Sequence, residues 1–150
     1  MLLHASAVCS EGKGYLFAGR SGAGKSTVAR LLSGVAQVLS DELVVARRST
    51  EGWRVYSTPF WGEFGSPGVN LSAPLQGIYL LQHASQHRVE RLPLRRALSA
   101  VLQCTLQFAE GEQVAEWMLN TTSALVREVP VYRLHFLPDI GFWDLVRAAP

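Results

Sequence analysis

The chain is 150 residues long, carries a formal net charge of +2 and is 48% hydrophobic. This length suffices for one domain with a sizeable core, and the small net charge gives no indication of nucleic-acid binding. No apolar stretch reaches the roughly 18 residues of a membrane span, and the first residues lack the pattern of a signal peptide. We therefore expect a single cytoplasmic domain, residues 1–150, that binds neither nucleic acid nor a membrane.

The first half of the chain is predicted to be rich in strands. Residues 2–9 and 15–18 are joined by the turn signal at 11–14, which predicts a β-hairpin. A helix is predicted over residues 25–33, directly after a glycine-rich segment. Further strands are predicted at residues 36–39, 43–47 and 53–57, and the last two form a second hairpin.

Helices dominate the second half, after a loop rich in glycine, proline and aromatic residues at 58–74. Strands are predicted at 77–82, 88–92 and 131–136, and a terminal helix at 142–147. This order of elements predicts an α/β fold with a mixed β-sheet and flanking helices. Two longer helices lie between the strands, and we expect their apolar stripes to pack in the core. The stripes are Leu94, Leu98, Val101, Leu102, Thr105 and Leu106 in the first helix, and Val114, Trp117, Met118, Thr121 and Leu125 in the second.

Residues 19–26 read Gly-Arg-Ser-Gly-Ala-Gly-Lys-Ser and fit the P-loop (Walker A) pattern. Its glycines let the backbone approach a polyphosphate, and the N-terminus of the following helix attracts anions. Lys25 can reach the β- and γ-phosphates, and the Ser26 hydroxyl can bind Mg²⁺. The only other lysine is Lys13, so the lysine in this motif is not explained by a high lysine content of the chain. The pattern predicts ATP and Mg²⁺ as cofactors. The residues predicted to bind them are Gly19, Arg20, Ser21, Gly22, Ala23, Gly24, Lys25, Ser26 and Thr27.

Phosphoryl transfer also needs a carboxylate for the metal and a group that orients or deprotonates the acceptor. Asp41 and Glu42 follow the short strand predicted after the helix, and we expect that strand to end beside the phosphates. Glu63, in the glycine-rich loop, is a further candidate. Ordinary surface acids are the alternative for all three. We predict Ser26, Asp41, Glu42 and Glu63 as metal ligands, and Asp41 and Lys25 as catalytic residues.

A histidine and two aromatic residues are weaker candidates. His4 lies on the first predicted strand, where it can contact phosphate or assist the acceptor, and a structural histidine is the alternative. Phe60 and Trp61 can shield the site from water or stack on a base, and core packing is the alternative. Cys9 and Cys104 lack metal-ligand spacing and are predicted to be reduced core thiols.

The order of these motifs resembles the catalytic domain of HPr kinase/phosphorylase. It is still more similar to the short HPr-kinase-like proteins grouped with ATP-dependent phosphoenolpyruvate carboxykinase. The resemblance rests on the strand with His4, the P-loop at residues 19–26 and the acidic pair Asp41-Glu42. It implies an HPr-kinase/carboxykinase-like P-loop fold. It also implies a catalytic or metal-binding role for Asp41, a metal-binding role for Glu63 and a catalytic role for His4. The family's acidic pair is usually two aspartates, and its glycine-rich signature is not recognisable here.

These residues predict an ATP- and Mg²⁺-dependent kinase that phosphorylates a hydroxyl. The resemblance implies a serine-type acceptor in a peptide, a protein or a small molecule, and the sequence is compatible with a homo-oligomer. One alternative is a metabolite kinase of the parallel P-loop class, with arginines near residues 88–96 closing over the nucleotide. The other is a nucleotide-binding regulatory module with little turnover.

Overall fold

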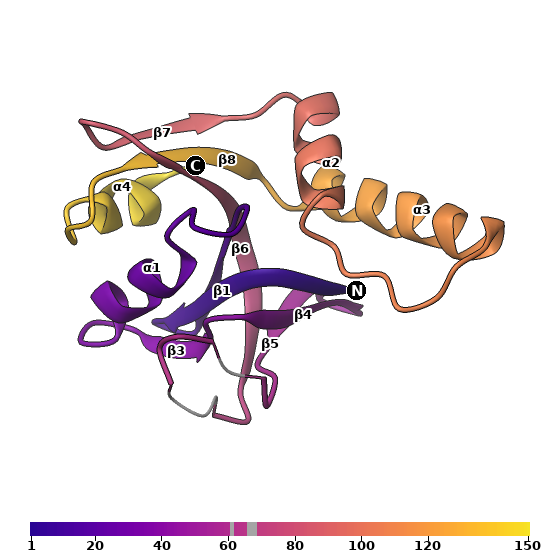
Figure 1. The fold of residues 1–150 in the computed structure, drawn as a ribbon, viewed down its shortest axis with the longest axis horizontal. Helices are drawn as coiled ribbons and strands as arrows, with labels where there is room; N and C mark the ends of the chain where they lie inside the picture. The colour runs from indigo at the N-terminus through magenta and orange to yellow at the C-terminus, as the bar shows by residue number, and fades with distance from the viewer. Residues whose placement is uncertain (61, 66–68) are drawn as a thin grey trace.

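The computed structural model of the chain describes residues 1–60, 62–65 and 69–150, and it has a mixed α/β fold (Figure 1). Within these residues, one eight-stranded sheet is flanked by four helices. Both parallel and antiparallel pairings occur, which confirms the predicted mixed sheet. The elements are β1 (Leu2–Ser10), β2 (Lys13–Ala18), α1 (Lys25–Leu32), β3 (Gln37–Ser40), β4 (Leu43–Ser49), β5 (Gly52–Tyr56), β6 (Ser72–His83), β7 (Arg88–Arg91), α2 (Leu94–Leu102), α3 (Glu112–Glu128), β8 (Val131–Phe136) and α4 (Phe142–Ala148).

The first strand is the branching point of the sheet. The later residues of β1 pair with β2 and β3, and its first residues pair with β4, antiparallel in each case. β2 lies parallel to β6, and β6 lies parallel to β8. Because β4, β5 and β6 also pair in succession, the strands β2, β1, β4, β5 and β6 close into a ring. The hairpin before the P-loop motif is therefore held from both sides.

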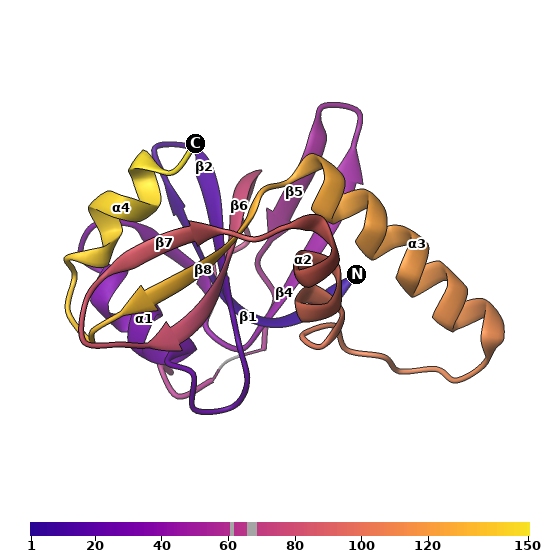
Figure 2. The same ribbon diagram turned by 90° about the horizontal axis from the view of Figure 1, so that it is seen from above.

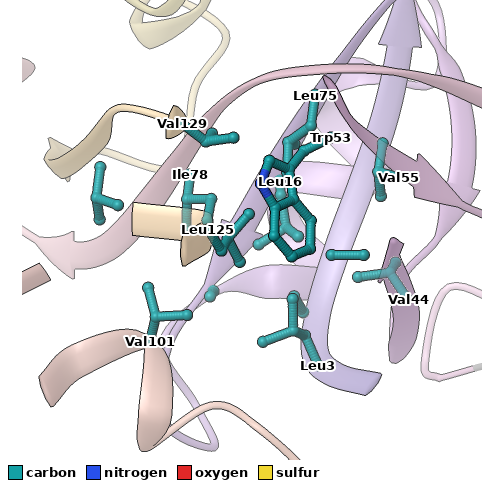
Figure 3. Close-up of a cluster of buried hydrophobic side chains, with 14 of the residues drawn as sticks. Leu3, Leu16, Val44, Trp53, Val55, Leu75, Ile78, Val101, Leu125 and Val129 are labelled. Carbon is teal, nitrogen blue, oxygen red and sulfur yellow. The ribbon is translucent and has the colours of Figure 1, made fainter. Parts of the chain in front are cut away.

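One core fills the ring and the space under α2 and α3 (Figure 3). Leu16 and Ile78 come from neighbouring strands, and Trp53 packs among them at 6% exposure. The helices contribute Val101 and Leu125, which are 1% and 0% exposed. Full burial of each such aliphatic side chain contributes about 1.5–3 kcal/mol, so this cluster fixes the helices on the sheet.

A second core lies on the opposite face of the sheet, under α1 and α4. Its centre is aromatic, because the ring of Tyr79 stacks on those of Phe17 and Tyr132 at centroid distances of 5.5 and 5.1 Å. The buried hydroxyl of Tyr79 donates to the Val146 carbonyl, and burial raises the pKa of that phenol. This bond ties α4 to the sheet that leads into the P-loop motif.

The expected burial of both helical stripes is wrong in part. In α2, Val101 is buried but Leu94 is 47% exposed, and in α3 Leu125 is buried but Trp117 is 54% exposed. The reason is geometric: only the C-terminal part of α3 packs on the body, and its N-terminal part extends away from the sheet (Figure 2). None of the helices in the described ranges is long and apolar enough to cross a membrane.

Candidate active site

The candidate residues gather at one edge of the sheet. β2, β6 and β8 are parallel, so their C-terminal ends lie at the same edge. β3 pairs with β1 and not with β2. It is nevertheless antiparallel to β1 and thus runs in the direction of β2. Asp41 therefore follows the end of β3 at the edge where His4 lies near the start of β1 and β2 ends before Gly19.

The P-loop motif forms the connection between β2 and α1. Gly22 and Gly24 have φ angles of 77° and 102°, which side-chain-bearing residues rarely adopt. A Cβ on Gly24 would lie 2.6 Å from the Phe136 ring, so the loop packs directly on the end of β8. His83 stacks on the same ring at 5.2 Å, and its Nε2 lies 3.2 Å from the Gly22 carbonyl oxygen. The end of β6 and the end of β8 thus brace the loop.

The first turn of α1 provides free backbone donors. The Val28 N–H donates to the Gly24 carbonyl, but the N–H groups of the three preceding residues have no partner within the helix. No acidic side chain lies in this turn, and no side chain caps it. Such a helix start, following two glycines in the left-handed region, can accept an anion.

Lys25 points back into the loop. It is 6% exposed, and its Nζ donates to the carbonyls of Gly19 and Arg20, both at 3.2 Å. Burial lowers the pKa of Lys25, and the Glu42 carboxylate opposes this effect. Because an ammonium group has three donors, one N–H remains for a ligand oxygen.

Asp41 anchors the loop after β5. It is 1% exposed, its Oδ1 accepts from the Gly62 N–H at 2.8 Å, and its Oδ2 accepts from the Phe64 N–H at 2.7 Å. The residue between these two donors is Glu63, whose side chain is exposed. The structure therefore brings Glu63 to the corner where Asp41 and Glu42 lie, although nearly all of the Asp41 side chain is enclosed.

Glu42 presents the more accessible carboxylate of the pair. Its side chain is 41% exposed, and its Oε1 lies 3.3 Å from Nε2 of His4, whose side chain is 32% exposed. The Ala5 N–H donates to the Glu42 carbonyl, which fixes the connection between β3 and β4 to β1 at this point. His4 and Glu42 together form a half-exposed pair that can exchange a proton with a bound group.

The side-chain oxygen atoms at this edge are suitable ligands for a Mg²⁺ ion that is bound together with a polyphosphate. No group of three or more His, Cys, Asp or Glu side chains in the described part of the chain is arranged to hold a metal alone. Mg²⁺ is usually held by one or two carboxylates together with phosphates and water, so such a cage is not required. Ser26 is half-buried at the start of α1, and Glu42 and Glu63 remain accessible as carboxylates.

An open hollow of about 810 Å³ lies beside the P-loop motif, on the α2 side of the sheet. His4, Arg20 and Cys104 contribute to its lining, as does Arg133 from β8. Arg133 has no ion-pair partner among the described residues. Glu90 lies opposite Arg133 across the β7–β8 pair, but its carboxylate is directed to Arg88 and His135. The hollow is therefore lined by positive and neutral groups next to the loop.

Besides Arg133, three residues at this edge were not among the sequence candidates. His83 and Phe136 brace the loop from strand ends that pattern analysis treats as ordinary core strands. Burial raises the pKa of the Cys104 thiol, and the nearby Lys25 ammonium and Gly19 backbone oppose this effect. Cys104 is free and half-buried, as is Cys9. Only the three-dimensional pairing of the segment after α2 with β1 places Cys104 here.

The aromatic candidates of the glycine-rich loop have different outcomes. Phe60 is 54% exposed, so it does not pack in the core. Its carbonyl accepts a hydrogen bond from the Ser40 hydroxyl at 3.2 Å, which holds the start of this loop against the end of β3. Trp61 lies outside the described residues.

The fold and this edge define a mixed α/β protein with a P-loop sequence between a central strand and a helix. Over residues 1–149 the chain matches the family described as SynChlorMet cassette protein ScmC, and it belongs to that family. No curated protein matches the chain. Among solved structures, it is similar to the Hpr(Ser) kinase/phosphatase from Coxiella burnetii, with 12% sequence identity and a TM-score of 0.48. That similarity covers 98% of this chain and 91% of the other.

Proposed function

We propose that the protein is an ATP- and Mg²⁺-dependent kinase that phosphorylates a hydroxyl, namely a serine-type hydroxyl of a peptide, a protein or a small molecule. One observation carries the proposal: the P-loop sequence, the accessible His4–Glu42 pair and buried Asp41 lie at the same edge of one sheet. A phosphate cradle alone would support binding. Acid and base groups beside it support transfer.

The P-loop motif would hold the donor. In this proposal the backbone amides at the start of α1 face the phosphates, and the remaining N–H of Lys25 reaches a phosphate oxygen. Mg²⁺, when bound, would neutralise charge on the transferred phosphoryl group. Ser26 and the accessible carboxylate of Glu63 are the residues that would hold it, beside the acidic pair.

The acceptor hydroxyl would meet the acidic pair. Since the Asp41 oxygens already accept two loop N–H groups, we propose that Asp41 positions this corner. Glu42, with His4 as its proton partner, would be the group that orients or deprotonates the hydroxyl. The hollow lined by Arg20 and Arg133 is open to the remainder of the acceptor.

A second candidate function is a nucleotide-binding module with little turnover. The observation that favours it is the enclosure of Asp41, whose carboxylate is engaged by Gly62 and Phe64 in place of a ligand. The metabolite-kinase alternative gains no such support. Arg88 lies in the edge strand β7, where its side chain contacts Glu90 and His135 within the same sheet. It therefore does not form part of a lid over the P-loop motif.

The deciding experiment follows γ-phosphate transfer from labelled ATP with Mg²⁺ to a panel of serine-containing peptides, proteins and free serine, read by mass spectrometry. We expect transfer to at least one acceptor, and loss of both ATP binding and transfer in Lys25→Ala. Lys13→Ala, in the exposed β1–β2 hairpin, is the matched control and should behave as the parent chain. Tight ATP binding without transfer, unchanged in Glu42→Gln and Asp41→Asn, would favour the module.

A further inference from the structure

The N-terminal part of α3 and the loop before it carry an unusual set of exposed side chains. Phe108 is 81% exposed, Trp117 54%, Leu119 47% and Leu106 36%. Single exposed apolar residues are normal, but large apolar side chains on one protruding element indicate an interaction site. We call this the arm surface. It consists of Leu106, Phe108, Glu110, Glu112, Glu116, Trp117 and Leu119.

The helical part of the arm surface faces away from the protein core. At about 100° per residue, Glu112, Glu116 and Leu119 form one row along α3, and Trp117 lies about 100° around the helix from Glu116, on a neighbouring side that is also exposed. The buried residues of α3 all lie in its C-terminal half, from Thr122 onward. Figure 2 shows this half against the body and the other half extending beyond it. The row is therefore available to a partner.

The charge of this region has one sign. Between Arg96 and Arg127 the sequence contains three glutamates and no lysine, arginine, histidine or aspartate, although the whole chain has a net charge of +2. None of the three glutamates forms an ion pair in the part of the chain that the structure describes. Glu112 lies in the first turn of α3, where the helix dipole favours an acid, but Glu116 lies a turn later. Helix stability thus does not account for the full acidic set.

We propose that the arm surface binds a basic, amphipathic peptide segment of a partner protein. Phe108 and Trp117 provide large apolar anchors, and the three glutamates complement lysine or arginine side chains beside the partner's apolar face. A second copy of this chain fits less well, because pairing of two arm surfaces would bring their glutamates together.

The arm is tied directly to the candidate active site. The His4 N–H donates to the Cys104 carbonyl at 2.8 Å, and the Leu106 N–H donates to the Leu2 carbonyl at 2.9 Å. The segment that leads to the arm surface is therefore hydrogen-bonded to the start of β1. Cys104, in this segment, also lines the hollow beside the P-loop motif. This short segment therefore connects the wall of the hollow to the arm surface, where the partner segment would bind. Binding of the partner segment does not depend on phosphoryl transfer.

The test uses the full chain without ATP and two fluorescent synthetic peptides that differ only in charge. Both have the same amphipathic leucine pattern, one with lysines and the other with glutamates at the polar positions. Fluorescence anisotropy should show saturable binding of the lysine peptide alone. Glu116→Lys should weaken this binding at least tenfold, whereas Glu51→Lys, at an exposed turn between β4 and β5, makes the same charge change and should leave it unaltered.

A second variant separates apolar contact from charge. Trp117→Ser should also weaken binding of the lysine peptide about tenfold, with an unchanged circular dichroism spectrum as the check on folding. Equal binding of both peptides, equal effects of Glu116→Lys and Glu51→Lys, or no binding would overturn the proposal. So would a concentration-dependent dimer that Phe108→Ser abolishes, because it would identify a second copy as the occupant. If the lysine peptide binds but the experiment with labelled ATP finds no phosphoryl transfer to any acceptor, only the kinase proposal is contradicted.

Discussion

The Gly62 N–H donates to Oδ1 of Asp41 across 2.8 Å, and a Cβ at residue 62 would come within 2.7 Å of the other carboxylate oxygen. This close approach explains why a glycine follows the aromatic residues of the loop. It also separates the two acids of the pair by role. Asp41 holds the loop, whereas Glu42 meets His4 and remains accessible.

Substitution of the two acids by their amides should therefore have different effects. In Asp41→Asn an amide NH₂ faces a loop N–H, which leaves a buried donor unsatisfied and should cost about 1–3 kcal/mol of unfolding free energy. Glu42→Gln, at a half-exposed position, should change stability by no more than about 0.5 kcal/mol but slow transfer by roughly 10²–10⁴-fold. Urea denaturation and initial transfer rates measure the two effects. A Glu42→Gln variant that transfers phosphate at the parent rate would show that Glu42 is not the proton acceptor.

Two glycines of the P-loop motif offer a matched pair of substitutions. Gly22→Ala places a Cβ in open space at a φ of 77°, and Gly24→Ala places one 2.6 Å from the Phe136 ring at a φ of 102°. Strain alone should cost about 1–2 kcal/mol in Gly22→Ala. The added overpacking should bring a further 1–3 kcal/mol in Gly24→Ala. Denaturant unfolding of both variants measures the difference.

The clash with Phe136 can be tested by a second substitution. Phe136→Leu opens a cavity and destabilises the parent chain on its own, because the ring is fully buried. In a chain that already carries Gly24→Ala, Phe136→Leu should lower the unfolding free energy by less. The double variant should therefore be more stable than the sum of the two single changes predicts. Simple additivity would show that the loop shifts to avoid the ring.

Much of this fold follows from local sequence patterns. The sequence predicts both strands of the hairpin into the motif to within two residues and β8 to the residue, because alternating apolar residues and turn signals are local. It does not predict the pairing of β3 with β1, since pairing partners depend on closure of the ring. Likewise, periodicity identified Trp117 as part of an apolar stripe but carried no information about whether another segment covers it. His83 and Cys104 reach the motif only through such long-range pairing.

The thiol of Cys104 should report on the P-loop motif. Burial raises its pKa, which reduces the reactive thiolate, so N-ethylmaleimide should modify it slowly at neutral pH. Because Cys104 lies near Lys25 and Gly19, we expect ATP with Mg²⁺ to slow the reaction further, and modification to reduce ATP affinity. Mass spectrometry of a Cys9→Ser chain follows this site alone, and a Cys104→Ser chain reports Cys9 as the control. An unchanged Cys104 rate at saturating ATP would contradict its placement beside the nucleotide.

ATP affinity should fall as the pH becomes alkaline. The fall should begin at a lower pH than the one at which an ordinary lysine loses its proton. Burial lowers the pKa of Lys25 from its usual 10.5, and the ammonium attracts phosphates only while it is protonated. As the pH rises through this lowered pKa, the attraction is lost, by up to about tenfold in affinity per pH unit. The free chain should show the opposite trend in stability. Its unfolded form binds more protons between the lowered pKa and 10.5, so the Lys25 contribution favours folding as the pH rises through that window.

Isothermal titration of ATP between neutral pH and pH 10 measures this dependence. In Lys25→Arg the guanidinium stays protonated over the whole range, so any affinity that the variant retains should vary little with pH. Lys13→Arg, on the exposed hairpin, should reproduce the parent profile. An equal alkaline loss of affinity in the parent chain and in Lys25→Arg would show that another group titrates, and that Lys25 does not contact the phosphates.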